Sequence, residues 1–188
     1  MFFLGLALFI GVHVLTALPI RATVREAMGE KPYRAIYSLL SLLGFGLMIY
    51  GYTDAHNAYR GTLLYQPPPF LKHIAMLLVL FAFWGLAATN SKGKIHALVQ
   101  HPQILGVKLW AFAHLLANGD LFSVIFFGSF LAWAVIARVS YKRRGVKGPD
   151  RNVSFGLRDV VVMVIGTVLY GAFAFWAHPA WIGVSVAG

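Results

Sequence analysis

Residues 70–89 have the sequence FLKHIAMLLVLFAFWGLAAT, a run of 20 residues in which Lys72 is the only Asp, Glu, Lys or Arg. A helix of about this length crosses the hydrocarbon core of a bilayer, which is roughly 30 Å thick. Five further apolar runs lie on either side of it, at about residues 2–20, 35–51, 102–117, 121–137 and 160–176. The sequence therefore predicts an all-α, polytopic integral membrane helix bundle with about six transmembrane helices, in a single domain over residues 1–188.

The composition supports this class and excludes several others. Of the 188 residues, 59% are hydrophobic and 12% are charged, which is about half the charged fraction of soluble domains. The formal net charge of +10 would favour a nucleic-acid partner in a soluble protein, but here the basic residues lie between apolar runs. Membrane orientation and anionic headgroups account for that pattern, so we expect a lipid bilayer and no nucleic acid. Without cysteine the chain has no disulfide, iron–sulfur cluster or thiolate-ligated zinc.

The distribution of Lys and Arg predicts the orientation. The segments after the first, third and fifth apolar runs contain four, two and seven of these residues. The segment after the second run contains Arg60, to which Lys72 at the start of the third run is added, and the segment after the fourth run contains none. Cytoplasmic loops of membrane proteins carry the excess of basic residues. We therefore expect three cytoplasmic basic loops, both termini in the periplasm, and a location in a bacterial inner membrane.

The short connection Asn118-Gly119-Asp120 separates the fourth and fifth runs. Gly119 is expected to end one helix in a left-handed conformation, and Asp120 to cap the next. The polar segment between the second and third runs, about residues 52–69, is predicted to be an external loop. Its prolines at 67–69 cannot continue a helix.

Histidines are the strongest candidates for chemistry in this cysteine-free chain. His56, His96 and His178 are predicted to lie in loops or at membrane edges, where solvation accounts for them. His13 and His114 instead fall within apolar runs, and an ionisable residue at that depth is by default a functional hypothesis. The alternative is that each is a neutral histidine hydrogen-bonded between packed helices.

The residues around these two histidines recur at helical spacing. Aromatic, small and polar residues share one face of each predicted helix: Phe9, His13 and Thr16 on the first, and Gln103, Gly106, Trp110, His114 and Ala117 on the fourth. Two such faces could enclose a haem, as helix bundles do, or could simply pack against neighbouring helices. Lys108 and Arg21 are candidate partners for haem propionates, although snorkelling and membrane orientation also explain them.

Residues 101–120, HPQILGVKLWAFAHLLANGD, closely resemble the signature of the NnrU family, as does Gly11-Val12-His13. The resemblance extends over essentially the whole chain. That family includes bacterial proteins genetically tied to denitrification, through nitrite and nitric oxide reduction, and the plant zeta-carotene isomerase, a membrane haem enzyme. The resemblance implies a haem b whose iron is held by His13 and His114. Ala111 stands where the plant motif has a cysteine, which excludes a cysteine-based change of iron ligand here.

Three functions remain open on this basis. The first is a haem b protein of nitrogen-oxide metabolism or its redox control, working with a quinone or with nitrogen-oxide reductase components. The second is a haem-dependent isomerase of an apolar polyene, and the third a haem-free assembly or regulatory subunit. In the first two, His13 and His114 are the predicted metal ligands, and the predicted cofactor-binding set is His13, His114, Trp110, Gln103, Gly106, Lys108 and Arg21.

Overall fold

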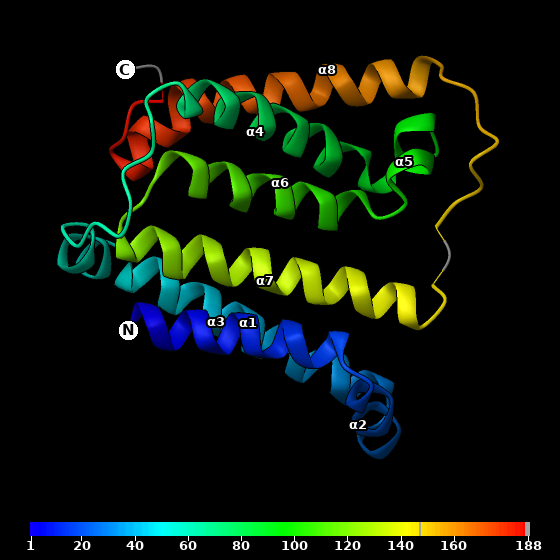
Figure 1. Ribbon diagram of the computed structural model, residues 1–188. Helices are drawn as coiled ribbons and strands as arrows, with labels where there is room; N and C mark the ends of the chain where they lie inside the picture. The colour runs from blue at the N-terminus through cyan, green and yellow to red at the C-terminus, as the bar shows by residue number, and fades with distance from the viewer. Residues whose placement is uncertain (147, 187–188) are drawn as a thin grey trace. The chain divides into compact units, whose positions relative to one another are not determined.

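The computed structural model of the protein describes residues 1–146 and 148–186 (Figure 1). Lys147, one of the basic residues of the predicted third cytoplasmic loop, lies outside the described residues. The described residues form helices and no β-strand, which confirms the all-α class. In chain order the helices are α1 Phe2–Ala17, α2 Ile20–Met28, α3 Glu30–Tyr59, α4 Leu71–Ala87, the 3₁₀ turn η1 Ala88–Asn90, α5 Lys94–Val99, α6 Pro102–Ala117, α7 Leu121–Arg143, α8 Leu157–Ala172 and the π-helix η2 Phe173–Ile182.

The helix lengths confirm an integral membrane protein and revise the number of spans. Within the described residues, four stretches are each long and apolar enough to cross a membrane, and α1 with α2 makes a fifth although the two are bent by 96°. α6 has only 16 residues, about 24 Å of helix, which is less than the roughly 30 Å of the hydrocarbon core. By length the count is thus four to five rather than six, because α6 is short and α1 reaches spanning length only together with α2. The four long stretches are Glu30–Tyr59, Leu71–Asn90, Leu121–Arg143 and Leu157–Ile182.

The helices belong to two compact units. The first unit comprises Met1–Gln66 and Asn118–Gly145, and so contains α1, α2, α3 and α7. The second comprises Pro67–Ala117 and the described part of 146–188, and contains α4, η1, α5, α6, α8 and η2. The single domain remains a prediction.

In the first unit, α1 packs on α3 with the two backbones in close approach. A Cβ atom added at Gly5 would lie 2.6 Å from the carbonyl oxygen of Gly44, and one added at Gly44 would lie 2.8 Å from the backbone nitrogen of Phe9. Small residues allow membrane helices to approach this closely. Near the N-terminus the buried ring of Phe2 lies 4.8 Å from the ring of Phe122, which fixes α1 against α7 as well.

The segment after α3 is joined to the start of α7 by backbone contacts. Leu63 and Asp120 form an isolated antiparallel bridge, and the backbone nitrogen of Leu121 donates to the carbonyl of Thr62 at 2.8 Å. The predicted cap is confirmed, because the Asp120 carboxylate accepts a hydrogen bond of 2.9 Å from the backbone N–H of Ser123. This cap satisfies one of the unpaired donors at the start of α7.

The expected left-handed conformation of Gly119 is wrong. Its carbonyl accepts a hydrogen bond from the backbone N–H of Leu64 at 2.8 Å, and an added Cβ would collide with the carbonyl oxygen of Tyr65. Glycine is therefore required here for the close approach of two backbones. In the described part of the chain, positive φ values occur at Gly29, Gln100, Gly145 and Gly183.

In the second unit, α4 packs against both α6 and α8. On the α6 side, a Cβ added at Gly85 would lie 3.1 Å from the carbonyl oxygen of Pro102. On the α8 side, Trp84 covers Gly166 and donates its indole N–H to the Thr167 hydroxyl at 3.0 Å. α4 is thus held by small-residue contacts on one side and by a large aromatic side chain on the other.

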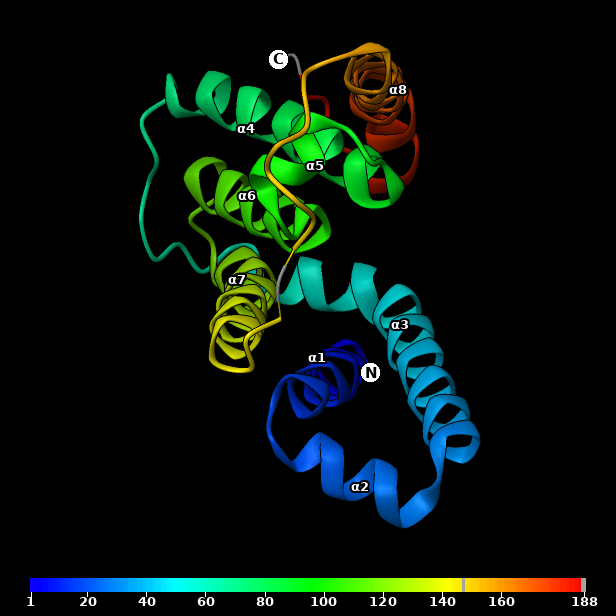
Figure 2. The same ribbon diagram turned by 90° about the vertical axis from the view of Figure 1, so that its right-hand side faces the viewer.

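Several helices extend further than the apolar runs that predicted them. α3 continues to Tyr59 and α7 to Arg143, into segments predicted as loops, and η2 continues past Pro179. Part of the first predicted basic loop is the helix α2, turned sharply from α1 in Figure 2. Hydropathy marks the part of a helix that lies in lipid, whereas backbone hydrogen bonding can continue beyond it.

Candidate functional site

His13 lies one turn before the end of α1 and is half-buried. Its Nδ1 atom is 2.7 Å from the carbonyl oxygen of Phe9. Because a carbonyl can only accept, Nδ1 carries the proton, and Nε2 is the nitrogen with the lone pair in the neutral ring. The Phe9 ring stacks on the imidazole at 4.2 Å between centroids, and the rings of Tyr37 and Trp133 each lie 5.4 Å away.

His114 has the same local arrangement on α6. Its Nδ1 atom is 2.8 Å from the carbonyl oxygen of Trp110, four residues earlier, so that Nε2 again carries the lone pair. The Trp110 ring lies 5.2 Å from the imidazole. The predicted neighbours Trp110 and His114 are therefore brought together by the spacing of one helical turn.

Each imidazole is suited to bind a metal ion through Nε2. Histidines that ligate metals usually donate their other ring N–H to a carbonyl or carboxylate, which fixes the tautomer and orients the ring. His13 and His114 both have this hydrogen bond. His13 belongs to the first unit and His114 to the second, and their pairing as ligands of one iron stays a prediction.

The other predicted residues of α6 differ in their surroundings. A Cβ added at Gly106 would lie 3.0 Å from the carbonyl oxygen of Ala82 and 3.1 Å from the Leu86 side chain, so Gly106 packs against α4. Gln103 is exposed and Lys108 is half-exposed. The structure thus gives Gly106 a packing role, while the cofactor-binding roles of Gln103, Gly106 and Lys108 stay predictions.

Three histidines predicted to lie in loops or at membrane edges belong to helices. His56 is part of α3, where its ring stacks on Tyr52 at 5.6 Å. His96 is in α5, and His178 is in η2, where its Nδ1 lies 2.8 Å from the carbonyl oxygen of Val184. The sequence also gave no signal for Tyr37 and Trp133 beside His13, because they come from α3 and α7 and only folding brings them there.

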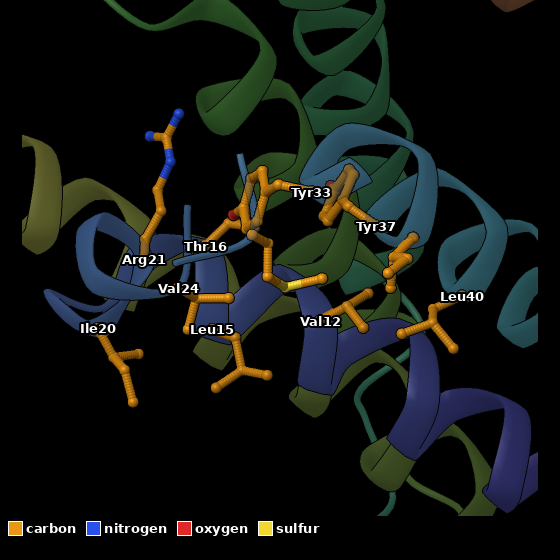
Figure 3. Close-up of a pocket in the computed structure, with 11 residues that line it drawn as sticks. Val12, Leu15, Thr16, Ile20, Arg21, Val24, Tyr33, Tyr37 and Leu40 are labelled. Carbon is orange, nitrogen blue, oxygen red and sulfur yellow. The ribbon is translucent and has the colours of Figure 1, made fainter. Parts of the chain in front are cut away.

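Arg21, predicted as a propionate partner, lies at a cavity of about 150 Å³ where α1, α2 and α3 meet. In Figure 3 its side chain extends away from the apolar side chains of Leu15 and Ile20. The same cavity is lined by Thr16 and Tyr37. Thr16 donates its hydroxyl to the His13 carbonyl at 2.8 Å, so the cavity and the candidate ligand share neighbours on α1 and α3.

Comparison with known proteins supports the family assignment. No curated protein and no solved structure matches the chain. The family model described as "NnrU protein" matches residues 1–186, essentially the full length. The predicted resemblance, which rested on residues 101–120 and on Gly11-Val12-His13, is thereby confirmed, and the chain belongs to the NnrU family.

Proposed function

We propose that this chain is a haem b protein of a bacterial inner membrane in which His13 and His114 supply the iron ligands. The proposal combines membership of the NnrU family with the haem site and the link to denitrification that the resemblance implies. Its role would be in nitrogen-oxide metabolism or in the redox control of that metabolism. A quinone or components of a nitrogen-oxide reductase would be its electron-transfer partners.

One observation carries the proposal, and it is common to both histidines. Each donates Nδ1–H to the carbonyl four residues earlier, at 2.7 Å for His13 and 2.8 Å for His114. This leaves Nε2 with the lone pair and limits rotation of the ring, as in metal-binding histidines. The donor set therefore fits an iron that takes imidazole ligands. The same hydrogen bond would also satisfy a histidine that only packs in a membrane helix, so an experiment has to separate the two.

When bound, haem b would supply one-electron chemistry at its iron, and two imidazole ligands suit electron transfer. The protein would bind the cofactor, orient the imidazoles and exclude water. Phe9 and Trp133 cover the His13 ring, and Trp110 lies beside His114. Binding of propionates by Lys108 or Arg21 remains part of the proposal.

The alternative of a haem-dependent isomerase stays a prediction and gains no further support from the site. Ala111, at the position of the plant cysteine, is completely buried in α6. Its methyl group cannot bind iron, so a reaction that exchanges histidine for cysteine is unavailable to this chain.

The test is the haem content and the visible spectrum of the detergent-purified protein, oxidised and then reduced with dithionite. We expect about one haem b per chain with a low-spin, bis-imidazole spectrum. His13→Gly and His114→Gly should each abolish that spectrum without changing the elution volume on size exclusion. Imidazole added to either variant should restore it, because a free imidazole can occupy the vacated position.

His73→Gly is the matched control, since His73 is an exposed histidine in the first turn of α4; it should keep the wild-type spectrum. A colourless wild-type protein that also fails to take up added haem would contradict the proposal and favour the haem-free assembly or regulatory subunit. Loss of folding in both glycine variants, with no colour in the wild type, would do the same.

A further inference from the structure

The cavity between α1, α2 and α3 has a hydrocarbon wall that the proposed haem function does not use. Val12 and Leu15 of α1, Val24 of α2 and Leu40 of α3 are among the apolar side chains that line it (Figure 3). An enclosed apolar cavity of roughly 150 Å³ can hold a molecule about the size of benzene. This cavity has a volume of about 150 Å³ and an apolar lining, so it is large enough for part of a hydrocarbon chain.

The cavity opens towards the outside of its unit. Leu15, Ile20 and Ile36, which line it, keep 52%, 51% and 44% of their surface exposed. Large apolar side chains exposed on a membrane protein lie against lipid chains. A lipid chain could thus enter from the bilayer without passing through the core of the unit.

Arg21 lies at one edge of the cavity, and its side chain extends away from Leu15 and Ile20 (Figure 3). Arg25 and Arg34 both pair with Glu30, at 3.4 and 2.6 Å. In the part of the chain that the structure describes, no acidic side chain forms a salt bridge with Arg21. Residues 21–34 contain four basic and two acidic side chains, a balance of +2, so this segment attracts anions.

The position of α2 indicates which anions are near. α2 is bent by 96° from α1, and its residues Ile20, Val24 and Met28 share one face that lines the cavity. A basic amphipathic helix of this kind lies in the interface between headgroups and acyl chains. The basic residues also place it on the cytoplasmic side, where anionic lipids are concentrated.

From these observations we propose that the cavity binds one acyl chain of an anionic phospholipid, whose phosphate is bound by Arg21. The hydrocarbon wall holds the chain, and the guanidinium at the edge pairs with the phosphate. Arg21 then selects lipids by headgroup charge, and the lipid fixes the bend between α1 and α2. Of the predicted cofactor-binding set, the cavity lining includes Arg21 alone, so variants at Val24 or Leu15 test the lipid site separately from the haem site.

Native mass spectrometry of the detergent-purified protein tests the proposal, with dioleoylphosphatidylglycerol and dioleoylphosphatidylcholine as probes. The two lipids have the same chains and differ in headgroup charge. We expect one tightly bound phosphatidylglycerol per chain and weaker binding of phosphatidylcholine. Arg21→Gln should lower the affinity for phosphatidylglycerol about fivefold. Lys31→Gln, which removes the same charge outside the cavity lining, should lower it less than twofold.

Filling the cavity tests the acyl chain independently of charge. Val24→Phe should weaken binding of both lipids, because its ring takes up space that the chain needs. If that variant is not monodisperse, Leu15→Phe fills the cavity from α1. Equal effects of Arg21→Gln and Lys31→Gln, or unchanged lipid binding in the filled variants, would overturn the proposal.

Two further results separate this site from other anions at Arg21. Soluble glycerol phosphate should not displace the lipid, and displacement would mean that the headgroup binds without the chain. Val24→Phe, which fills the cavity and changes no residue of the predicted cofactor-binding set, should keep the haem content of the wild type. In Arg21→Gln, lost haem together with unchanged phosphatidylglycerol binding would assign Arg21 to a propionate and contradict the lipid site.

Discussion

The carboxylate of Asp159 joins two helix ends in the second unit. It is 1% exposed and accepts hydrogen bonds from the backbone N–H of Ile95 at 2.7 Å, at the start of α5, and of Gly156 at 3.1 Å, at the start of α8. Each bond satisfies a donor that has no partner within its own helix. A negative charge at a helix N-terminus is also favourable. One side chain therefore holds two elements in place.

We expect Asp159→Ala to lower the free energy of unfolding by about 3 kcal/mol, because two backbone donors lose a charged acceptor. Asp159→Asn should cost less, since its amide oxygen can keep one bond. Thermal unfolding of the detergent-solubilised protein measures both. Asp150→Ala is the control, because Asp150 is exposed and accepts a hydrogen bond from the backbone N–H of Asn152, two residues away in the same loop. Equal melting temperatures for the Asp159 and Asp150 variants would refute this role.

At the two candidate ligands, the sequence could predict the local neighbours but not the distant ones. Helical spacing predicts that Phe9 lies beside His13 and Trp110 beside His114, because residues four apart are adjacent on a helix. Tyr37 and Trp133 approach His13 only through packing of α1 with α3 and α7. No periodicity within α1 encodes those contacts.

At the scale of the helix pair, the glycines of α1 and α3 offer a matched test. An added Cβ at Gly44 would lie 2.8 Å from the backbone nitrogen of Phe9, whereas one at Gly46, half a turn away, would meet nothing within 4 Å. We expect Gly44→Ala to lower the free energy of unfolding by about 1–3 kcal/mol, because it forces the two backbones apart.

Gly46→Ala should leave that stability unchanged or raise it slightly, since alanine favours a helix over glycine. Melting temperatures in one detergent compare the two variants directly. A larger loss for Gly46→Ala than for Gly44→Ala would show that helix propensity, and not the contact between α1 and α3, governs this pair.

Average hydropathy could not predict the helical segments that are rich in polar residues. The 9-residue α2, IRATVREAM, mixes charged, polar and apolar residues, so its average hydropathy resembles that of a loop. The apolar run at about residues 35–51 likewise covers only part of α3, which is 30 residues long. The remaining turns, around Asp54 and His56, are held by backbone hydrogen bonds and aromatic packing. By contrast, α6 begins and ends where the sequence predicted, at Pro102 and Ala117.

At the scale of the whole molecule, the absence of cysteine permits a direct test of membrane orientation. Single cysteines at Gly61, Lys92 and Arg144 can be labelled in intact spheroplasts with a maleimide that does not cross membranes. If the basic segments are cytoplasmic, only Gly61→Cys should react before the cells are permeabilised, and all three should react afterwards. Reaction of Arg144→Cys in intact cells would mean that α6 does not cross the membrane.

The bridge between Leu63 and Asp120 also limits how many times the chain can cross the membrane between these two residues. Thr62 and Leu121 are hydrogen-bonded to each other beside this bridge and therefore lie on the same side of a membrane. The chain between them must then cross the bilayer an even number of times. Leu71–Asn90 is long and apolar enough to be one of these crossings. If it is, the second crossing falls to α6, since α5 has only six residues. The 16-residue α6 would then cross only if the bilayer thins around it or its flanking residues reach into the headgroups.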